Sequence, residues 1–123
     1  MFDTHSHILY GMDDGSKRLS HSLGFAKQAL KQGVHTLFAT PHCYDGVYNC
    51  TKADILEACR RFSHDLSAAG LPLEVLPGAE IRVNHDLIEV FDNGDLLTLN
   101  NAGAYLLIEL PLHLYLRLKL KNY

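Results

Sequence analysis

Apolar residues recur along the chain at spacings that predict helices and strands in alternation. Between residues 19 and 30 they lie three and four positions apart and Gly33 follows, which predicts an amphipathic helix with a glycine C-cap. A second helix is predicted to begin after Thr51, an N-cap with Asp54 three residues on, and to end at Gly70. The apolar face of this second helix consists of Ile55, Cys59, Phe62 and Leu66.

Short, mostly apolar runs around these helices predict strands. They lie at about residues 2–4, 34–42 (a run that stops at Pro41), 73–76 and 104–110. Alternation with helices in units of roughly 30 to 40 residues indicates a parallel sheet with right-handed crossovers, and nearly continuous apolar strands indicate burial on both faces. The run 104–110 is the clearest of these buried strands. Turns are predicted at 93–95 and 100–103 and a short helix at 85–91, which completes an α/β chain with about four parallel strands.

Length, charge and cysteine content set the broad class of protein. With 123 residues, of which 47% are hydrophobic and 20% charged, the chain fits one globular domain. The formal net charge of −3 gives no reason to expect a nucleic-acid or anionic-membrane partner. Neither a signal peptide nor a run of ~20 apolar residues is found, so we expect a cytoplasmic chain without membrane insertion. Three cysteines without a C-x-x-C spacing predict free thiols.

Ionisable side chains follow the predicted strands at the points where the strands end. His5 and His7 follow the first strand, His42 the second, Glu80 the third and Glu109 the last. Parallel strands place their carboxyl ends at one rim, so these side chains are expected to converge there. A carboxylate in an apolar strand, such as Glu109, costs several kcal/mol unless it is paired or coordinated, which supports a functional site at this rim.

The H-x-H spacing suits a metal ion. Side chains alternate along a strand, so His5 and His7 share a face and both imidazoles can reach one cation. Imidazole together with carboxylate ligands fits zinc, manganese or iron, and Glu80 can bridge two ions about 3.5–4 Å apart. Asp13 or Asp14, in the adjoining loop, is close enough in sequence to supply another oxygen ligand.

Two further residues near the predicted rim are weaker candidates. Cys43, beside His42, is interpreted as a bystander thiol rather than an additional ligand or a thiolate. Arg82, two residues beyond Glu80, is a candidate for binding an anionic substrate. The chain has no G-x-S-x-G, P-loop or G-x-G-x-x-G motif, so the common serine-hydrolase and nucleotide-binding signatures are absent.

Four blocks of the sequence resemble a known family. They are similar, in order and spacing, to successive signatures of the manganese-dependent bacterial tyrosine phosphatases of the capsule-biosynthesis type, within the polymerase and histidinol phosphatase (PHP) superfamily. The resemblance covers roughly residues 1–111, and the aspartates of its first block favour the tyrosine-phosphatase branch. The blocks read "DTHSHILYGMDDGS", "ATPHCYDG", "LPGAEIRV" and "LTLNNAGAYLLIELP".

The resemblance implies the N-terminal part of a distorted, TIM-like β/α barrel of the PHP type. It also implies up to three metal ions at the rim of the barrel, with manganese first and iron, cobalt or zinc as other candidates. In the implied assignment, His5 and His7 bind one ion and Glu109 binds a second. Glu80 bridges these two ions. A third ion is bound by Asp14 and His42.

The resemblance further implies the substrate, which is phosphotyrosine on a cognate autophosphorylating tyrosine kinase that controls exopolysaccharide export. A metal-bound water held by His5, His7 and Glu80 would attack the phosphate in line, because coordination lowers the pKa of water toward ~7. The phenol of tyrosine, with a pKa of ~10, is a fair leaving group. The alternative within the superfamily is a phosphoesterase acting on histidinol phosphate or another small ester.

The last residues depart from the family pattern. Residues 112–123 alternate leucine with polar residues, unlike the family's helix at this point, and the family's later His-Pro-Glu-Arg and Asp-x-His blocks are not found. A complete β/α barrel usually takes ~200–250 residues. We therefore expect a partial phosphatase domain at 1–111 and a divergent tail at 112–123, from truncation or a frameshift. A second hypothesis is that the chain is an inactive metal-binding remnant. The sequence pattern predicts no oligomeric state.

Overall fold

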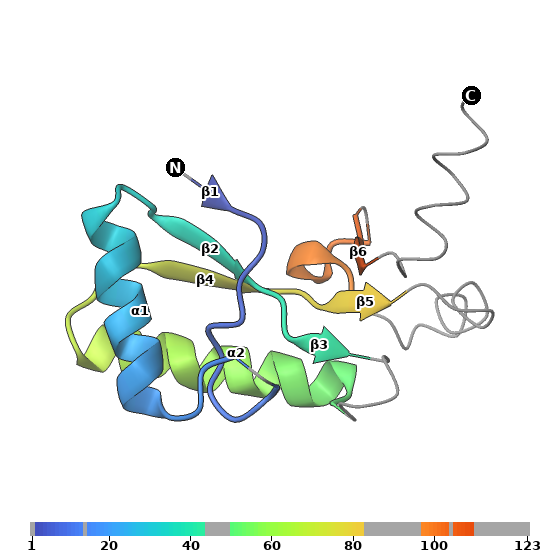
Figure 1. The fold of residues 1–123 in the computed structure, drawn as a ribbon, viewed down its shortest axis with the longest axis horizontal. Coiled ribbons are helices and arrows are strands. Elements are labelled where there is room, and N and C mark those ends of the chain that lie inside the picture. Colours follow the sequence, from blue (N-terminus) through green and yellow to red (C-terminus); the bar gives the residue numbers. More distant parts are fainter. Residues whose placement is uncertain (1, 14, 44–49, 83–96, 104, 110–123) are drawn as a thin grey trace.

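In the part of the chain that the structure describes, two small sheets pack with two α-helices (Figure 1). The computed structural model describes residues 2–13, 15–43, 50–82, 97–103 and 105–109. One sheet has the order β1 (Phe2–Asp3), β2 (Thr36–Ala39), β4 (Glu74–Pro77), and the other the order β3 (His42–Cys43), β5 (Glu80–Arg82), β6 (Leu107–Glu109). Every strand pairing in this part of the chain is parallel, which confirms the predicted α/β class.

The second sheet continues the first, because the chain runs from β2 into β3 and from β4 into β5. The pairing of β2 with β4 has the same residue offset as the pairing of β3 with β5, where His42 lies opposite Glu80. Pro41, which has no N–H to donate, lies in the break, and its carbonyl accepts a hydrogen bond of 2.9 Å from the N–H of Glu80. The predicted strand that stops at Pro41 is thus confirmed as β2, but His42 begins a separate strand instead of following directly on the end of this one. Glu80 likewise begins β5 rather than following the end of β4.

The two helices begin and end close to the predicted residues. α1 spans Leu19–Lys31 and connects β1 to β2, while α2 spans Lys52–Ala68 and connects β3 to β4. At the start of α2, Thr51 and Asp54 exchange side-chain and backbone hydrogen bonds in a capping box. Gly33 and Gly70 follow the two helices with φ of +83° and +70°, the left-handed conformation that a glycine C-cap requires.

The core lies where the helices pack on the sheet, and α2 contacts β4 directly. All four residues of the predicted apolar face of α2 are buried, with Phe62 at 0% exposure. On α1 the buried residues are the small ones, Ser22, Ala26 and Ala29, whereas the leucines of the predicted face are only partly buried. The Ser22 hydroxyl donates to the carbonyl of Ile8, which holds α1 close to the segment that follows β1.

The last strand is shorter and more exposed than predicted. Of the described residues 105–109, Leu107–Glu109 form β6, and Ile108 and Tyr105 are 42% and 74% exposed. β6 stands at the end of its sheet order, so in the described part of the chain it has a strand partner on one side only. The expectation of a long strand buried on both faces is therefore wrong for this strand.

Some predicted elements fall outside the described residues, namely the helix at 85–91, the turn at 93–95 and the tail at 112–123. The turn at 100–103 is confirmed: a short 3-10 helix, η1 (Leu99–Asn101), ends there, and Asn100 and Asn101 both have positive φ. No helix in the described part of the chain is long and apolar enough to cross a membrane.

Candidate metal centre

The segment after β1 carries His5, Ser6 and His7 alongside β2. The N–H of Ser6 donates to Oγ1 of Thr40 at 2.9 Å, and its hydroxyl donates to the carbonyl of Phe38 at 2.7 Å. Side chains alternate along an extended chain, so fixing Ser6 toward β2 turns the two histidines to the other side. Their Nε2 atoms lie 3.2 Å apart.

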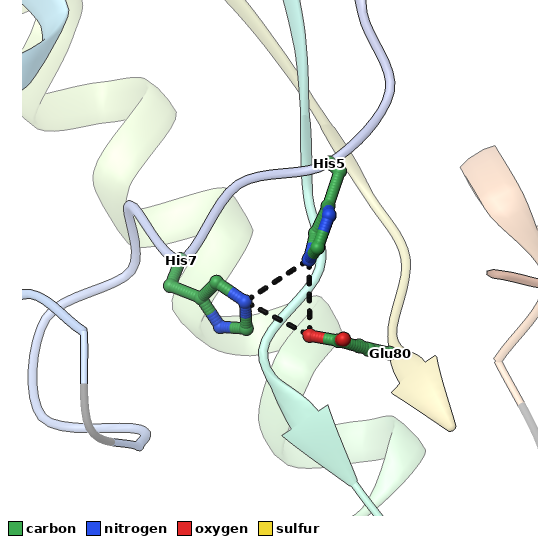
Figure 2. Close-up of side chains that lie close together, drawn as sticks. All are labelled: His5, His7 and Glu80. Carbon is green, nitrogen blue, oxygen red and sulfur yellow. Dashed lines mark hydrogen bonds and ion pairs between the residues drawn. The ribbon is translucent and has the colours of Figure 1, made fainter. Parts of the chain in front are cut away.

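Glu80, at the start of β5, completes a triangle of side-chain atoms with these histidines. Its Oε2 atom lies 3.0 Å from Nε2 of His5 and 2.9 Å from Nε2 of His7. Figure 2 shows the three side chains pointing toward one another from two separate segments. His5 is about half exposed at 49% of its side chain, while Glu80 is 12% exposed, so the carboxylate lies at the inner side of the group.

The spacing of these three atoms fits ligands of one metal ion. Ligand atoms about 2.1 Å from an ion lie about 3.0–3.4 Å from one another in octahedral or tetrahedral geometry. When both imidazoles are neutral and the carboxylate carries no proton, hydrogen bonds alone do not satisfy the triangle, because each Nε2 then carries at most one hydrogen. Three contacts thus share at most two hydrogens, whereas one cation satisfies all three atoms. Imidazole nitrogen and carboxylate oxygen are the donors that first-row divalent metals prefer.

Asp13 contacts the other nitrogen of His7. Its Oδ2 atom lies 2.6 Å from Nδ1 of His7 and accepts the backbone N–H of His42 at 2.9 Å, and its Oδ1 atom accepts the N–H of Gly15 at 2.9 Å. The Asp13 side chain has 0% exposure. Burial by itself raises the pKa of Asp13, but the hydrogen bonds from His7, His42 and Gly15 and the nearby charge of His7 outweigh it, so the net pKa is lowered. Asp13 is therefore an ionised, buried acceptor.

His42, at the start of β3, stands beside the same group. Its Nδ1 atom is 3.6 Å from Oε2 of Glu80, and its ring centroid is 4.7 Å from that of His7. His7, Asp13 and His42 form a second set of potential ligand atoms within 4.8 Å of one another, next to the set formed by His5, His7 and Glu80. The structure thus brings together four of the six residues predicted as metal ligands: His5, His7, His42 and Glu80.

The other predicted site residues are placed only in part. Asp14 lies outside the described residues. The backbone of Glu109 pairs with that of Arg82, two residues beyond the level at which Glu80 pairs with Leu107. The side chains of Glu109, Arg82 and Cys43 are also outside the described part of the structure.

Two residues of the first loop contribute more than the sequence suggested. Asp13 was predicted only as an alternative to Asp14 for an oxygen ligand, yet it contacts His7 and His42 at once. Gly15 packs so closely on His7 that a Cβ at position 15 would overlap the side chain and carbonyl of His7. The signal was the small, acidic composition of residues 13–16, but the pattern does not say which aspartate turns inward.

A cavity of about 430 Å³ opens beside the histidine pair. Its lining includes His5, Ser6 and His7 on one side and His21 and Phe25 of α1 on the other. Phe25 is 46% exposed, so the cavity offers an aromatic surface next to the candidate ligands.

The two cysteines with described side chains are not placed as nucleophiles. Cys59 is 4% exposed on the buried face of α2, and burial raises the pKa of its thiol to about 11, despite a smaller opposing effect of a hydrogen bond with Ser63. The thiol of Cys50 donates to the carbonyl of His42 at 2.9 Å. A reactive cysteine needs a lowered pKa and access, and Cys59 has neither.

The fold and the site define an α/β protein with a histidine and carboxylate cluster at its strand ends. Comparison with known families identifies it further: the family model described as "Capsular polysaccharide synthesis, CpsB/CapC" matches residues 1–118. The chain belongs to this family.

Individual relatives agree with this assignment. The chain is 38% identical to the tyrosine-protein phosphatase YwqE of Bacillus subtilis, over 100% of this chain and 51% of that protein. It is 34% identical to the tyrosine-protein phosphatase CpsB of Streptococcus agalactiae, over 89% of this chain and 44% of that protein. The chain therefore spans about half the length of these relatives.

A solved structure has the same fold over the whole of this chain. It comes from the crystal structures of YwqE from Bacillus subtilis and CpsB from Streptococcus pneumoniae, which are described as unique metal-dependent tyrosine phosphatases. The TM-score is 0.86 at 38% identity, over 100% of this chain and 53% of that chain.

Proposed function

We propose that this chain provides the metal-binding half of a cytoplasmic, metal-dependent protein-tyrosine phosphatase. The proposed substrate is phosphotyrosine on a tyrosine kinase that controls capsule or exopolysaccharide synthesis. The observation that carries the proposal is the triangle of Nε2 of His5, Nε2 of His7 and Oε2 of Glu80, with sides of 2.9–3.2 Å. The names of the relatives supply the reaction and the substrate class.

The proposed ligands extend this triangle with residues that the family resemblance assigns. His5, His7 and Glu80 hold one ion, Glu80 with Glu109 holds a second, and Asp14 with His42 holds a third. Manganese is the proposed metal, since its preference for oxygen ligands suits a centre with several carboxylates. When bound, the ions supply Lewis acidity, which lowers the pKa of coordinated water and neutralises charge on the phosphate. The fold proposed for the complete phosphatase is a distorted β/α barrel of the PHP type, of which the parallel strands here form the first part.

The residues of this chain bind and orient the reactants in the proposed reaction. A water oxygen forms a new bond to phosphorus as the bond from phosphorus to the phenol oxygen breaks, and the products are inorganic phosphate and tyrosine after the phenolate takes up a proton. The phenol has a pKa of ~10, so it leaves with limited help from an acid. The cavity beside His5 and His7 gives the substrate room next to the ligands, and Arg82 is proposed to bind an anionic group of the substrate.

A phosphatase assay with manganese tests this proposal. We expect the full chain, supplied with Mn²⁺, to hydrolyse p-nitrophenyl phosphate, and we expect His42→Ala and Glu80→Ala to abolish turnover. His64→Ala is the matched control, because His64 is exposed on α2 and should leave turnover unchanged. Faster hydrolysis of a phosphotyrosyl peptide than of histidinol phosphate would support the proposed substrate, and the reverse would favour the small-ester alternative.

The competing hypothesis is an inactive metal-binding remnant. The same ligand triangle favours metal binding in either case, so binding and turnover must be measured separately. Tight Mn²⁺ binding without turnover at any metal concentration would reject the enzyme for this chain and leave the remnant.

A further inference from the structure

We infer that Asp13 is a positioning residue for the candidate metal centre, because it fixes the His7 imidazole in the orientation and tautomer that a ligand needs. The inference rests on the proposed metal site and assigns Asp13 a role other than that of a ligand. It concerns the nitrogen of His7 that does not face Glu80.

The contacts of Asp13 fix three segments at once. Its carboxylate receives the N–H of His42 from β3, the N–H of Gly15 from the first loop, and Nδ1 of His7. The side chain is completely buried, so water does not replace these partners. Gly15 packs against Cβ and the carbonyl of His7 so closely that a side chain at position 15 would not fit.

The hydrogen-bond chemistry then determines the state of His7. An ionised carboxylate only accepts, so Nδ1 of His7 must carry the hydrogen in the 2.6 Å contact. In the neutral form, which is the form that binds a metal, the imidazole has a single N–H, so Nε2 presents a lone pair, and this is the atom that faces Oε2 of Glu80 at 2.9 Å. Metal-binding histidines commonly donate their other N–H to a carboxylate in this manner.

The same geometry argues against Asp13 as a ligand that shares an ion with His7. Two ligands of one ion lie about 3.0 Å or more apart, whereas Nδ1 of His7 and Oδ2 of Asp13 lie 2.6 Å apart, a distance typical of a charge-assisted hydrogen bond. His7 also takes part in both candidate ligand sets, and its Nδ1 hydrogen leaves only Nε2 for an ion. The set with His5 and Glu80 is therefore the one to which His7 contributes.

Asp13→Asn tests the inference, since asparagine keeps the shape of the side chain but places an NH₂ group where it can face Nδ1 of His7. We expect the His7 hydrogen to move to Nε2 and Mn²⁺ affinity to fall about 10–100-fold, measured by isothermal titration calorimetry. Nitrogen NMR of labelled histidine in the metal-free full chain reads the tautomer directly. Asp65→Asn on α2 is the control and should change neither quantity.

Several outcomes would overturn the role of Asp13. They are a neutral His7 that carries its hydrogen on Nε2 in the metal-free wild type, unchanged affinity in a folded Asp13→Asn variant, and the loss of one bound ion from the stoichiometry, which would make Asp13 a ligand. If Asp13→Asn does not fold, the tautomer of the wild-type protein still decides. Failure of the proposed function is distinguishable, because a chain that binds Mn²⁺ without turnover leaves the inference about Asp13 intact.

Discussion

Glu80→Gln is expected to weaken Mn²⁺ binding by about 100-fold or more. One oxygen of Glu80 faces both His5 and His7 at 2.9–3.0 Å, so it is the charged member of the candidate ligand set. Glutamine keeps the length of the side chain but has no charge and replaces one oxygen with an NH₂ group that repels a cation. Replacing residues that only support a ligand typically costs 10–100-fold in affinity, so a ligand itself should cost at least the upper value.

Calorimetric titration of the folded variant with Mn²⁺ measures this effect. Glu74→Gln is the matched control, because Glu74 is an exposed residue of β4, six positions before Glu80 in the sequence. Its affinity should equal that of the wild type. An affinity of the Glu80→Gln variant within about threefold of the wild-type value would remove Glu80 from the site.

Phe62→Ala is expected to lower the free energy of unfolding by about 3–5 kcal/mol. Phe62 is completely buried in the centre of the α2 face, which packs on β4. Truncation removes the transfer free energy of the ring and leaves a cavity that the close-packed surroundings fill only in part. Because β4 leads directly into the strand that carries Glu80, this packing also fixes one side of the candidate centre.

Urea denaturation of the full chain measures the change. Phe25→Ala serves as the control, since Phe25 is 46% exposed on α1 and its truncation should cost less than about 1 kcal/mol. A loss of less than about 1 kcal/mol for Phe62→Ala would contradict the core described for α2.

Local patterns were sufficient to predict the helices and the grouping of four candidate ligands. The helix ends depend on a few residues that cap the adjacent turn of the helix. These are Gly33 and Gly70 at the C-terminal ends, and the pair Thr51 and Asp54 at the start of α2. The H-x-H spacing similarly orients His5 and His7 through the alternation of an extended chain, and the order of parallel strands brings His42 and Glu80 to the same place.

Contacts between distant segments could not be read from the pattern. The break at Pro41 depends on the carbonyl of Pro41 receiving the N–H of Glu80 while the flanking strands keep their register. The choice between Asp13 and Asp14 is of the same kind, because the inward turn of Asp13 is stabilised by the backbone of His42, 29 residues away.

The position of a bound ion tests the account most directly. Crystals of the full chain grown with Mn²⁺ give an anomalous difference map at the manganese absorption edge. We predict a peak at bonding distance from Nε2 of His5, Nε2 of His7 and one oxygen of Glu80, with Nδ1 of His7 still held by Asp13. Manganese peaks only elsewhere, or none at a concentration that saturates binding in solution, would contradict the assignment of this cluster as the metal centre.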